Sequence, residues 1–306
     1  MTLDRRQLLT GVATGLLGGL VLPRRSPAQS PTAVALTDRL SLVTTGGTNV
    51  LALSTAEGLV LVDSGTPQLT EALMASLRQL SGGARVRTVF NTHWHLENTG
   101  ANEALRQAGA TIVAHENTRL WMATPTWIPA EDRYRVPRPQ AAHPTQTTRG
   151  DGTVSAGSAR VDYGYLLEAH TSGDIHIRFR ESNVLAVGDV ASPARDPELD
   201  YFTGAWIGGR VDALDQLLEL SDDRTRIVPG YGPVMSRAEL RAERDMMKTI
   251  YDRTVDRVRE GDEAEDMLKA GVLNGLPRTW KDPNKFLYDV NKGLWAHHNK
   301  LSPNVV

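Results

Sequence analysis

Two histidines separated by one residue follow an apolar run in the N-terminal half of the chain. The run covers residues 86–91 and leads into Thr92-His93-Trp94-His95-Leu96-Glu97-Asn98-Thr99-Gly100. We expect a strand to end at His93, and alternation along extended backbone then directs His93 and His95 to one side. Two imidazoles at the carboxyl end of a buried strand can bind a metal that keeps an open coordination position. The stretch therefore predicts a metal site.

This stretch resembles the His-x-His-x-Asp-His motif of the metallo-β-lactamase fold superfamily, in particular its glyoxalase-II-like and periplasmic branches. Further matches follow in the expected order and extend the resemblance over residues 36–240. They are Gly58-Leu59-Val60-Leu61-Val62-Asp63-Ser64-Gly65, Ala169-His170-Thr171-Ser172-Gly173-Asp174, Asn183-Val184-Leu185-Ala186-Val187-Gly188-Asp189 and Val228-Pro229-Gly230-Tyr231-Gly232-Pro233. The resemblance implies an α/β fold, an αββα sandwich with its ligands at strand ends along one edge.

Three positions depart from the superfamily pattern. Glu97 and Asn98 stand where the motif has Asp and His, and Tyr231 stands where a later motif has His. In the superfamily these positions hold a second metal, whereas the histidine pair holds the first. The resemblance therefore implies one intact metal subsite and one that has lost its imidazoles.

The intact subsite is implied to consist of His93, His95, His170 and Asp189, with one zinc per chain as the expected metal. Three histidines around zinc would lower the pKa of a bound water from about 15.7 towards about 7. Asp189 bridges both metals in the superfamily. With one metal missing it would ligate the other, orient the water or form a hydrogen bond.

Two further side chains are candidates for catalysis. Glu97 would act as general base, hold a second metal in distorted geometry, or accept a hydrogen bond from a ligand histidine. Tyr231 would donate to a developing oxyanion or fill the volume that a histidine vacates. Asp63 and Asp174 lie in turns and are expected to cap backbone amides. The remaining histidines lack a matching context and are expected to be structural or solvated.

Composition narrows the class of protein. The chain has 306 residues, of which 40% are hydrophobic, and it carries 34 basic against 36 acidic residues. Balanced charge without a basic-aromatic stripe argues against nucleic-acid binding. The chain contains no cysteine, which excludes disulfides and thiolate ligands and leaves His, Asp and Glu for any metal. The expected partner is a small-molecule substrate.

The N-terminus is typical of an export signal. Asp4-Arg5-Arg6-Gln7-Leu8-Leu9 opens an apolar, glycine-rich run to Leu22, followed by Ser26-Pro27-Ala28. We expect residues 1–28 to be a twin-arginine signal peptide that is cleaved after Ala28 and directs the chain to the periplasm. A membrane anchor is the alternative, but the run is short of the roughly 20 residues that a stable span needs.

Residues 29–306 are expected to form a single domain with a helical C-terminal extension. Apolar alternation predicts strands over residues 36–43 and 50–62, and helical periodicity predicts a helix over residues 68–80. Five prolines within residues 123–150 predict a long loop without regular elements, which would cover the substrate. Residues 237–301 show helical spacing, with an apolar stripe that is expected to join the core.

These patterns favour an exported metal-dependent hydrolase in which a metal-bound hydroxide attacks an ester, thioester, lactone or amide. Two alternatives stay open. His93, His170 and Asp189 match the two-histidine, one-carboxylate set that suits iron(II), which would make the chain a mononuclear iron dioxygenase with His95 as a spectator. The lost ligands also allow a non-catalytic, degenerate binding module.

Overall fold

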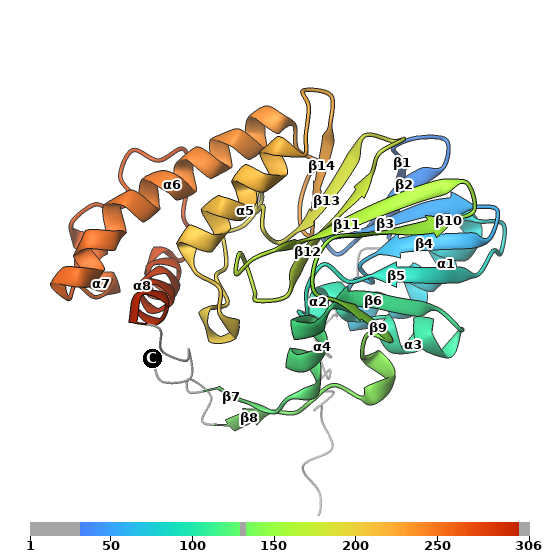
Figure 1. The fold of residues 1–306 in the computed structure, drawn as a ribbon, viewed down its shortest axis with the longest axis horizontal. Helices are drawn as coiled ribbons and strands as arrows, with labels where there is room; N and C mark the ends of the chain where they lie inside the picture. Colours follow the sequence, from blue (N-terminus) through green and yellow to red (C-terminus); the bar gives the residue numbers. More distant parts are fainter. Residues whose placement is uncertain (1–30, 129–132, 300–306) are drawn as a thin grey trace, which may run out of the picture.

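The computed structural model describes residues 31–128 and 133–299, so the predicted signal peptide lies outside the described residues. Two β-sheets pack face to face, and helices cover the outer face of each (Figure 1). The αββα sandwich expected from the sequence is confirmed. No helix in the described part of the chain is long and apolar enough to cross a membrane.

The first sheet has seven strands in the order β1-β2-β3-β4-β5-β6-β9. Their bounds are β1 (Thr32–Ala35), β2 (Leu40–Thr45), β3 (Thr48–Thr55), β4 (Gly58–Val62), β5 (Val86–Phe90), β6 (Thr111–His115) and β9 (Gln146–Thr148). Strands β1 to β4 pair antiparallel, and the pairs from β4 to β9 are parallel. The apolar stretch 50–62 is two strands rather than one, because Gly58 at φ 126° closes a turn between them.

The second sheet has five strands in the order β10-β11-β12-β13-β14. Their bounds are β10 (Gly152–Ala156), β11 (Ala159–Leu166), β12 (Asp174–Phe179), β13 (Val184–Gly188) and β14 (Arg226–Pro229). Only the β13–β14 pair is parallel. The ends of β5 and β13 meet at one edge of the sandwich, since a methyl group on Gly188 would lie 2.8 Å from Thr92 Cβ. This edge therefore collects the residues that follow both strands.

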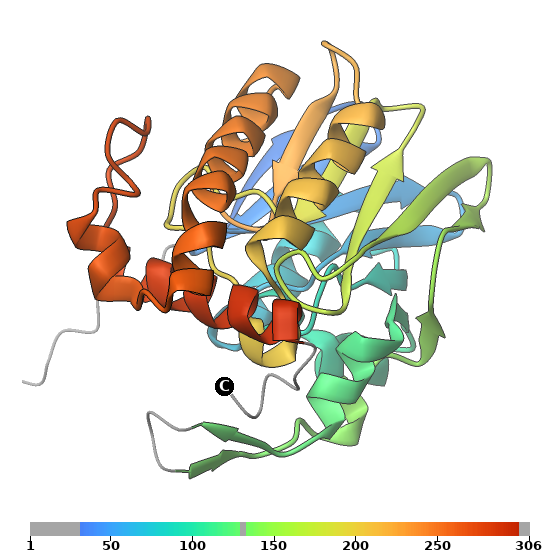
Figure 2. The same cartoon turned by 60° about the vertical axis from the view of Figure 1, so that its left-hand side comes forward.

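Helices cover the two outer faces unequally. The first sheet carries α1 (Thr70–Leu80) and α3 (Asn102–Gln107), with the short α2 (Leu96–Thr99) and α4 (Glu116–Ala123) near the sheet edge. The second carries α5 (Ile207–Glu219) and α6 (Arg237–Glu260), beside which α7 (Ala264–Lys269) and α8 (Pro283–Asn299) pack (Figure 2). Helix α6 begins at a capping box between Ser236 and Glu239 and ends at Gly261, as helix-capping chemistry predicts.

Three apolar clusters hold the layers together. One lies between the sheets and includes Leu40, Leu51, Val60, Val161, Ile175, Ile177 and Val184. A second joins the first sheet to α1 and α3, and the third joins the second sheet to α5, α6, α7 and α8. Met246, Met247 and Ile250 of α6 belong to this third cluster. The prediction that the C-terminal apolar stripe is core is confirmed.

The prediction of an irregular loop over residues 123–150 is wrong. Strands β7 (Thr126–Ile128) and β8 (Arg133–Arg135) form an antiparallel pair, and β9 joins the first sheet. Pro125 directly precedes β7, and Pro137, Pro139 and Pro144 lie between β8 and β9, where the missing N–H group breaks no ladder hydrogen bond. Three-residue strands therefore fit into a segment whose proline content would exclude longer elements.

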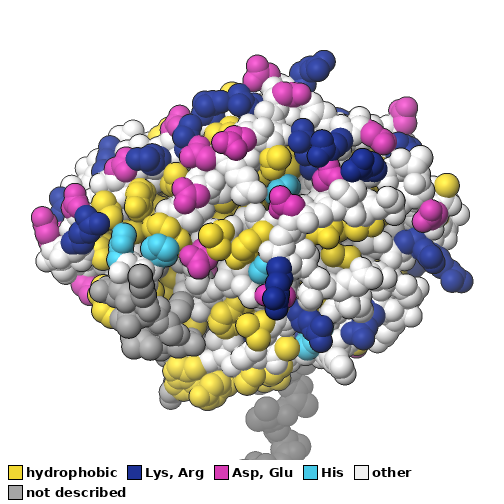
Figure 3. Space-filling view, in the orientation of Figure 1, with side chains coloured by type: hydrophobic (Ala, Val, Ile, Leu, Met, Phe, Trp, Pro, Cys, Tyr) yellow, Lys and Arg dark blue, Asp and Glu magenta, His cyan; other side chains and the backbone are white. Residues whose placement is uncertain are grey.

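The β7–β8 pair borders the histidine motif. The Arg135 guanidinium carbon lies 3.9 Å from the centre of the Trp94 ring, a cation–π contact. Hydrophobic side chains gather over this hairpin (Figure 3), where Trp127 is 38% and Tyr134 63% exposed. An apolar surface thus lies next to the residues that surround His93 and His95.

Candidate metal centre

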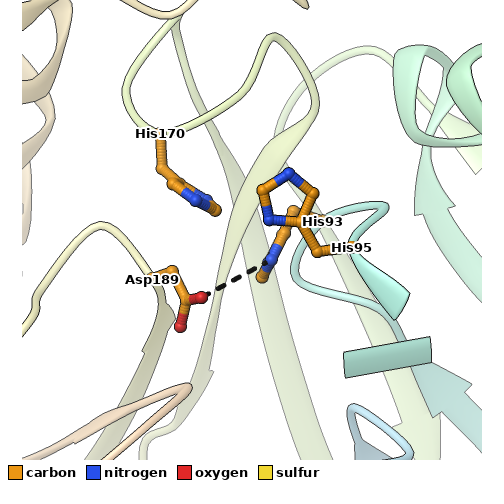
Figure 4. Close-up of side chains that lie close together, drawn as sticks. All are labelled: His93, His95, His170 and Asp189. Carbon is orange, nitrogen blue, oxygen red and sulfur yellow. Dashed lines mark ion pairs between the residues drawn. The ribbon is translucent and has the colours of Figure 1, made fainter. Parts of the chain in front are cut away.

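Four predicted ligands come together at the edge where the sheets meet. His93 follows β5, His95 precedes α2, His170 lies between β11 and β12, and Asp189 directly follows β13. One ligand atom from each lies within 4.8 Å of the others (Figure 4). His93 Nε2 lies 3.8 Å from Asp189 Oδ2. Segments distant in sequence thus place three imidazoles and one carboxylate around one point.

The three imidazole rings face one another almost at right angles. The centroid of the His93 ring lies 4.9 Å from that of His95 and 4.7 Å from that of His170, and the His95 and His170 centroids lie 4.7 Å apart. His93 and His170 are fully buried, and His95 is 8% exposed. None of the three rings is set apart from the other two.

Several buried nitrogens in this group have no hydrogen-bond partner. They are His93 Nε2 and both Nδ1 and Nε2 of His170. A buried polar atom without a partner costs roughly 1–3 kcal/mol, so such atoms are rare unless something else satisfies them. A metal ion would do so, and the donor set of three imidazoles and one carboxylate suits zinc. The residues present therefore fit a metal ion.

The hydrogen bonds around His93 select its metal-binding nitrogen. Asp63 Oδ1 accepts from the backbone N–H of Thr92 at 2.8 Å, and Asp63 Oδ2 accepts from the Thr92 hydroxyl at 2.8 Å. Since that hydroxyl proton goes to Asp63, its oxygen accepts from His93 Nδ1 at 2.9 Å. His93 Nε2 is then the unprotonated nitrogen, as a metal ligand requires. The predicted amide-capping role of Asp63 is confirmed.

His95 is held from its other nitrogen. Its Nε2 lies 3.2 Å from Asp200 Oδ2, which also accepts from Trp94 Nε1 at 3.1 Å. The arrangement leaves His95 Nδ1 for a metal and matches the carboxylate–histidine pairs that orient metal ligands. Sequence reasoning missed Asp200, because no motif spacing marks a residue in the loop after β13.

Asp174 supports His170 through the backbone rather than the ring. Its Oδ2 accepts from the N–H groups of His170 and Thr171 at 2.7 and 2.6 Å. Its Oδ1 lies 3.6 Å from His170 Nδ1, beyond hydrogen-bond distance. The turn that presents His170 is therefore fixed while both ring nitrogens stay unengaged, as predicted for a carboxylate that caps backbone amides.

The protonation preferences of His93 and His170 suit metal ligands, whereas that of His95 favours its charged form. Burial holds the pKa of His93 and His170 well below the usual histidine range, and the neighbouring His95 acts in the same direction. Burial opposes a charge on His95 too, but the Asp200 hydrogen bond and the nearby carboxylates outweigh it and raise the pKa to about 9. Burial raises the pKa of Asp189 to about 6, against the lowering effect of Arg195. Two of the three imidazoles are thus neutral before any metal binds.

The three substituted positions lie outside the four-residue group. Glu97 sits at the start of α2, 36% exposed, with its Oε1 3.9 Å from Arg195 Nη1. Asn98 is buried and donates from Nδ2 to Asp63 Oδ2 at 2.9 Å, while its Oδ1 has no partner. Space at this point is tight, because a methyl group on Gly230 would lie 2.3 Å from Asp189 Oδ1.

Tyr231 packs against two neighbours. A methyl group on Gly47, which has φ 96°, would lie 2.3 Å from Tyr231 Cε2, and the Arg195 guanidinium carbon lies 4.9 Å from the Tyr231 ring centre. The tight contact requires glycine at position 47. Arg195 also forms an ion pair with Asp189. The sequence analysis did not predict this contact, and the only signal for it in the sequence is that Arg195 lies six residues after Asp189.

The other described histidines stand apart from the group. His115 caps α4 through its Nδ1 and stacks on Tyr165 with ring centroids 4.1 Å apart. His176 is buried within β12. His297 is exposed, but it stacks on Trp206 at 3.6 Å between centroids. These roles are structural.

Comparisons with known proteins identify the family. The model of the metallo-beta-lactamase superfamily matches residues 43–266, well over half of the chain, and the chain belongs to this superfamily. A metallo-beta-lactamase type 2 from Bacillus cereus is 26% identical over 201 residues, 65% of this chain and 73% of that protein. One from Bacillus sp. (strain 170) is 25% identical over 200 residues, 65% of this chain and 72% of that protein.

Solved structures share the fold at lower identity. A metallo-beta-lactamase from Pontibacter korlensis has a TM-score of 0.59 at 20% identity and covers 71% of this chain and 99% of its own. A stereoselective inverting sec-alkylsulfatase from Pseudomonas sp. has a TM-score of 0.63 at 16% identity and covers 88% of this chain and 50% of its own. Enzymes named for different reactions therefore share this fold, so the fold alone does not identify the substrate.

Proposed function

We propose that this chain is an exported, zinc-dependent hydrolase that acts with one metal ion on an ester, thioester, lactone or amide. The observation that carries the proposal is the set of three buried imidazole nitrogens without partners, beside the Asp189 carboxylate. His93, His95, His170 and Asp189 would hold the ion. Bound zinc would lower the pKa of a coordinated water to about 7 and polarise a substrate carbonyl.

The roles of the remaining residues follow from their positions. Asp189 would orient the attacking water, and Glu97, which is 36% exposed, would take up its proton as general base. The Tyr231 phenol would donate a hydrogen bond to the developing oxyanion. The hairpin formed by β7 and β8 would border the substrate, since Arg135 contacts Trp94 beside the two motif histidines.

The iron dioxygenase alternative requires His95 to stand aside from His93, His170 and Asp189. The ring distances argue against this, because His95 lies as close to His170 as His93 does. Its Nε2 is also held by Asp200, in the way that ligand histidines are commonly oriented. A binding module without metal would leave the unpaired nitrogens uncompensated. Both observations favour the three-histidine zinc site.

Metal analysis and a substrate panel test the proposal. Purified protein should contain about one zinc per chain and hydrolyse at least one of an aryl ester, a thioester, a lactone, a β-lactam and a secondary alkyl sulfate. The last two are included because of the relatives' names. A chelator should abolish hydrolysis, and added zinc should restore it. Iron in place of zinc would favour the dioxygenase, and protein that binds no metal would favour the binding module.

Export is proposed from residues that lie outside the described part of the chain. If the twin-arginine signal is correct, the double substitution Arg5→Lys and Arg6→Lys should block processing and periplasmic accumulation. Cell fractionation with detection of precursor and mature forms would measure this. A conservative change of Arg24→Lys, outside the paired motif, is the matched control. Unchanged processing in the double variant would contradict the proposal and favour an anchor.

A further inference from the structure

One arginine contacts three residues that the superfamily resemblance associates with a second metal. Arg195 Nη2 forms an ion pair with Asp189 Oδ2, and Nη1 lies 3.9 Å from Glu97 Oε1. The guanidinium carbon lies 4.9 Å from the centre of the Tyr231 ring. A single guanidinium thus occupies the space between the two carboxylates and the phenol.

The position of Arg195 is fixed by the fold rather than left to a mobile surface side chain. Its side chain is only 28% exposed. Its backbone oxygen accepts from Arg278 Nη1, and Arg278 Nη2 donates to the Ser192 oxygen at 2.8 Å. The C-terminal region therefore holds the loop that carries Arg195 against the metal group.

The third substituted residue of this subsite, Asn98, is engaged as well. Asn98 donates its Nδ2 to Asp63 at 2.9 Å, which orients its amide. The remaining negative charge of the subsite comes from Asp189 and Glu97, and both lie against Arg195. A guanidinium stays protonated throughout the physiological pH range. A divalent cation at this subsite would be repelled by a permanent positive charge, and it would lack the imidazole ligands that the superfamily provides.

We propose that the Arg195 guanidinium is a resident cation that takes the place of the second metal ion. The inference rests on the proposed one-metal hydrolase and deepens it. Arg195 supplies the positive charge beside Asp189 that a second ion would supply, and it prevents a metal ion from binding at this subsite. It acts as a positioning residue, because it holds the Asp189 carboxylate that faces the three imidazoles.

This inference changes what restoring the lost ligands should achieve. Converting Glu97→Asp, Asn98→His and Tyr231→His would rebuild the superfamily's side chains at the second subsite. With Arg195 in place, this triple variant should still bind about one zinc or cobalt(II) ion per chain. Adding Arg195→Met should raise the stoichiometry to about two. Metal content after dialysis and the absorption bands of cobalt(II) during titration measure this without reference to activity.

Single variants test the same point in the natural background. Arg195→Met should take up a weaker second equivalent of cobalt(II) between Asp189 and Glu97, whereas Arg195→Lys keeps the charge and should titrate like the wild type. Circular dichroism and thermal unfolding would show that each variant is folded.

The outcomes separate this inference from the proposed function. Two metals in the triple variant that retains Arg195 would overturn the inference, even if the Arg195→Met proteins fail to fold. One metal in a folded quadruple variant, or identical titrations of Arg195→Met and Arg195→Lys, would overturn it too. A wild-type protein that binds no metal would instead contradict the proposed hydrolase.

Discussion

Replacing His170 with alanine should remove most bound metal and lower kcat/KM by more than about a hundredfold, since losing even a residue that only orients a ligand typically costs 10–100-fold. Neither nitrogen of His170 has a protein partner, so the substitution breaks no hydrogen bond within the chain. The metal-free variant should therefore unfold close to the temperature of the metal-free wild type. The metal-loaded wild type should be more stable than the metal-free wild type, because a ligand that binds only the folded state stabilises it.

A matched control separates loss of a ligand from loss of a buried histidine. His176 is also buried, at 5% exposure, but lies within β12 and outside the metal group. His176→Gln should keep its metal and its activity. Alanine at position 93 or 95 should behave like alanine at 170, because the three rings are equivalent by distance. Full metal retention by His95→Ala would contradict the three-histidine site and favour the two-histidine iron site.

The four-residue group was predicted from the resemblance of its motifs to the superfamily, and strand ends explain why these motifs meet in space. His93 and Asp189 each follow an apolar strand, and parallel or facing strands bring such positions to one edge of a sandwich. His170 and Asp174 share a turn whose Asp caps the backbone. Each of these features is encoded within about ten residues of sequence, so the resemblance of short motifs was enough to indicate them.

Arg195 and Asp200 could not be predicted in this way. Both lie in the loop after β13, and no hydrophobic period places a loop residue relative to an active site. The path of this loop depends on Arg278, more than eighty positions away along the chain. The short strands of the proline-rich segment escaped prediction for a related reason. Strand β9 forms by pairing with β6, and three residues contain too little alternation to indicate a strand.

A buried ion pair between two helices contacts the same loop and leads to the second large effect. Arg210 of α5 is fully buried, and its Nη2 lies 3.3 Å from Glu243 Oε1 of α6 and 2.9 Å from Ser192 Oγ. Glu243 Oε1 also accepts from the backbone N–H of Ser192 at 2.8 Å. The helices on the outer face of the second sheet thus hold the loop that runs from Asp189 to Asp200.

Glu243→Ala should lower the free energy of unfolding by about 3–5 kcal/mol, because it leaves the Arg210 guanidinium buried without a counter-charge. Glu243→Gln keeps an acceptor for Ser192 and should cost less. Urea unfolding of the metal-free proteins, compared at equal ionic strength, would measure both. The double variant Glu243→Leu with Arg210→Met should recover much of the loss, since replacing a buried pair by apolar residues is often neutral or stabilising. A loss below about 1 kcal/mol for Glu243→Ala would show that water reaches Arg210 and that the pair does not hold the loop.

Because Asp189, Arg195 and Asp200 all depend on that loop, Glu243→Ala should also weaken zinc binding, although residue 243 touches none of the proposed ligands. The apolar double variant tests whether packing without the hydrogen bonds restores zinc affinity. If stability returns while zinc affinity stays low, the hydrogen bond to Ser192 is the contact that positions the loop.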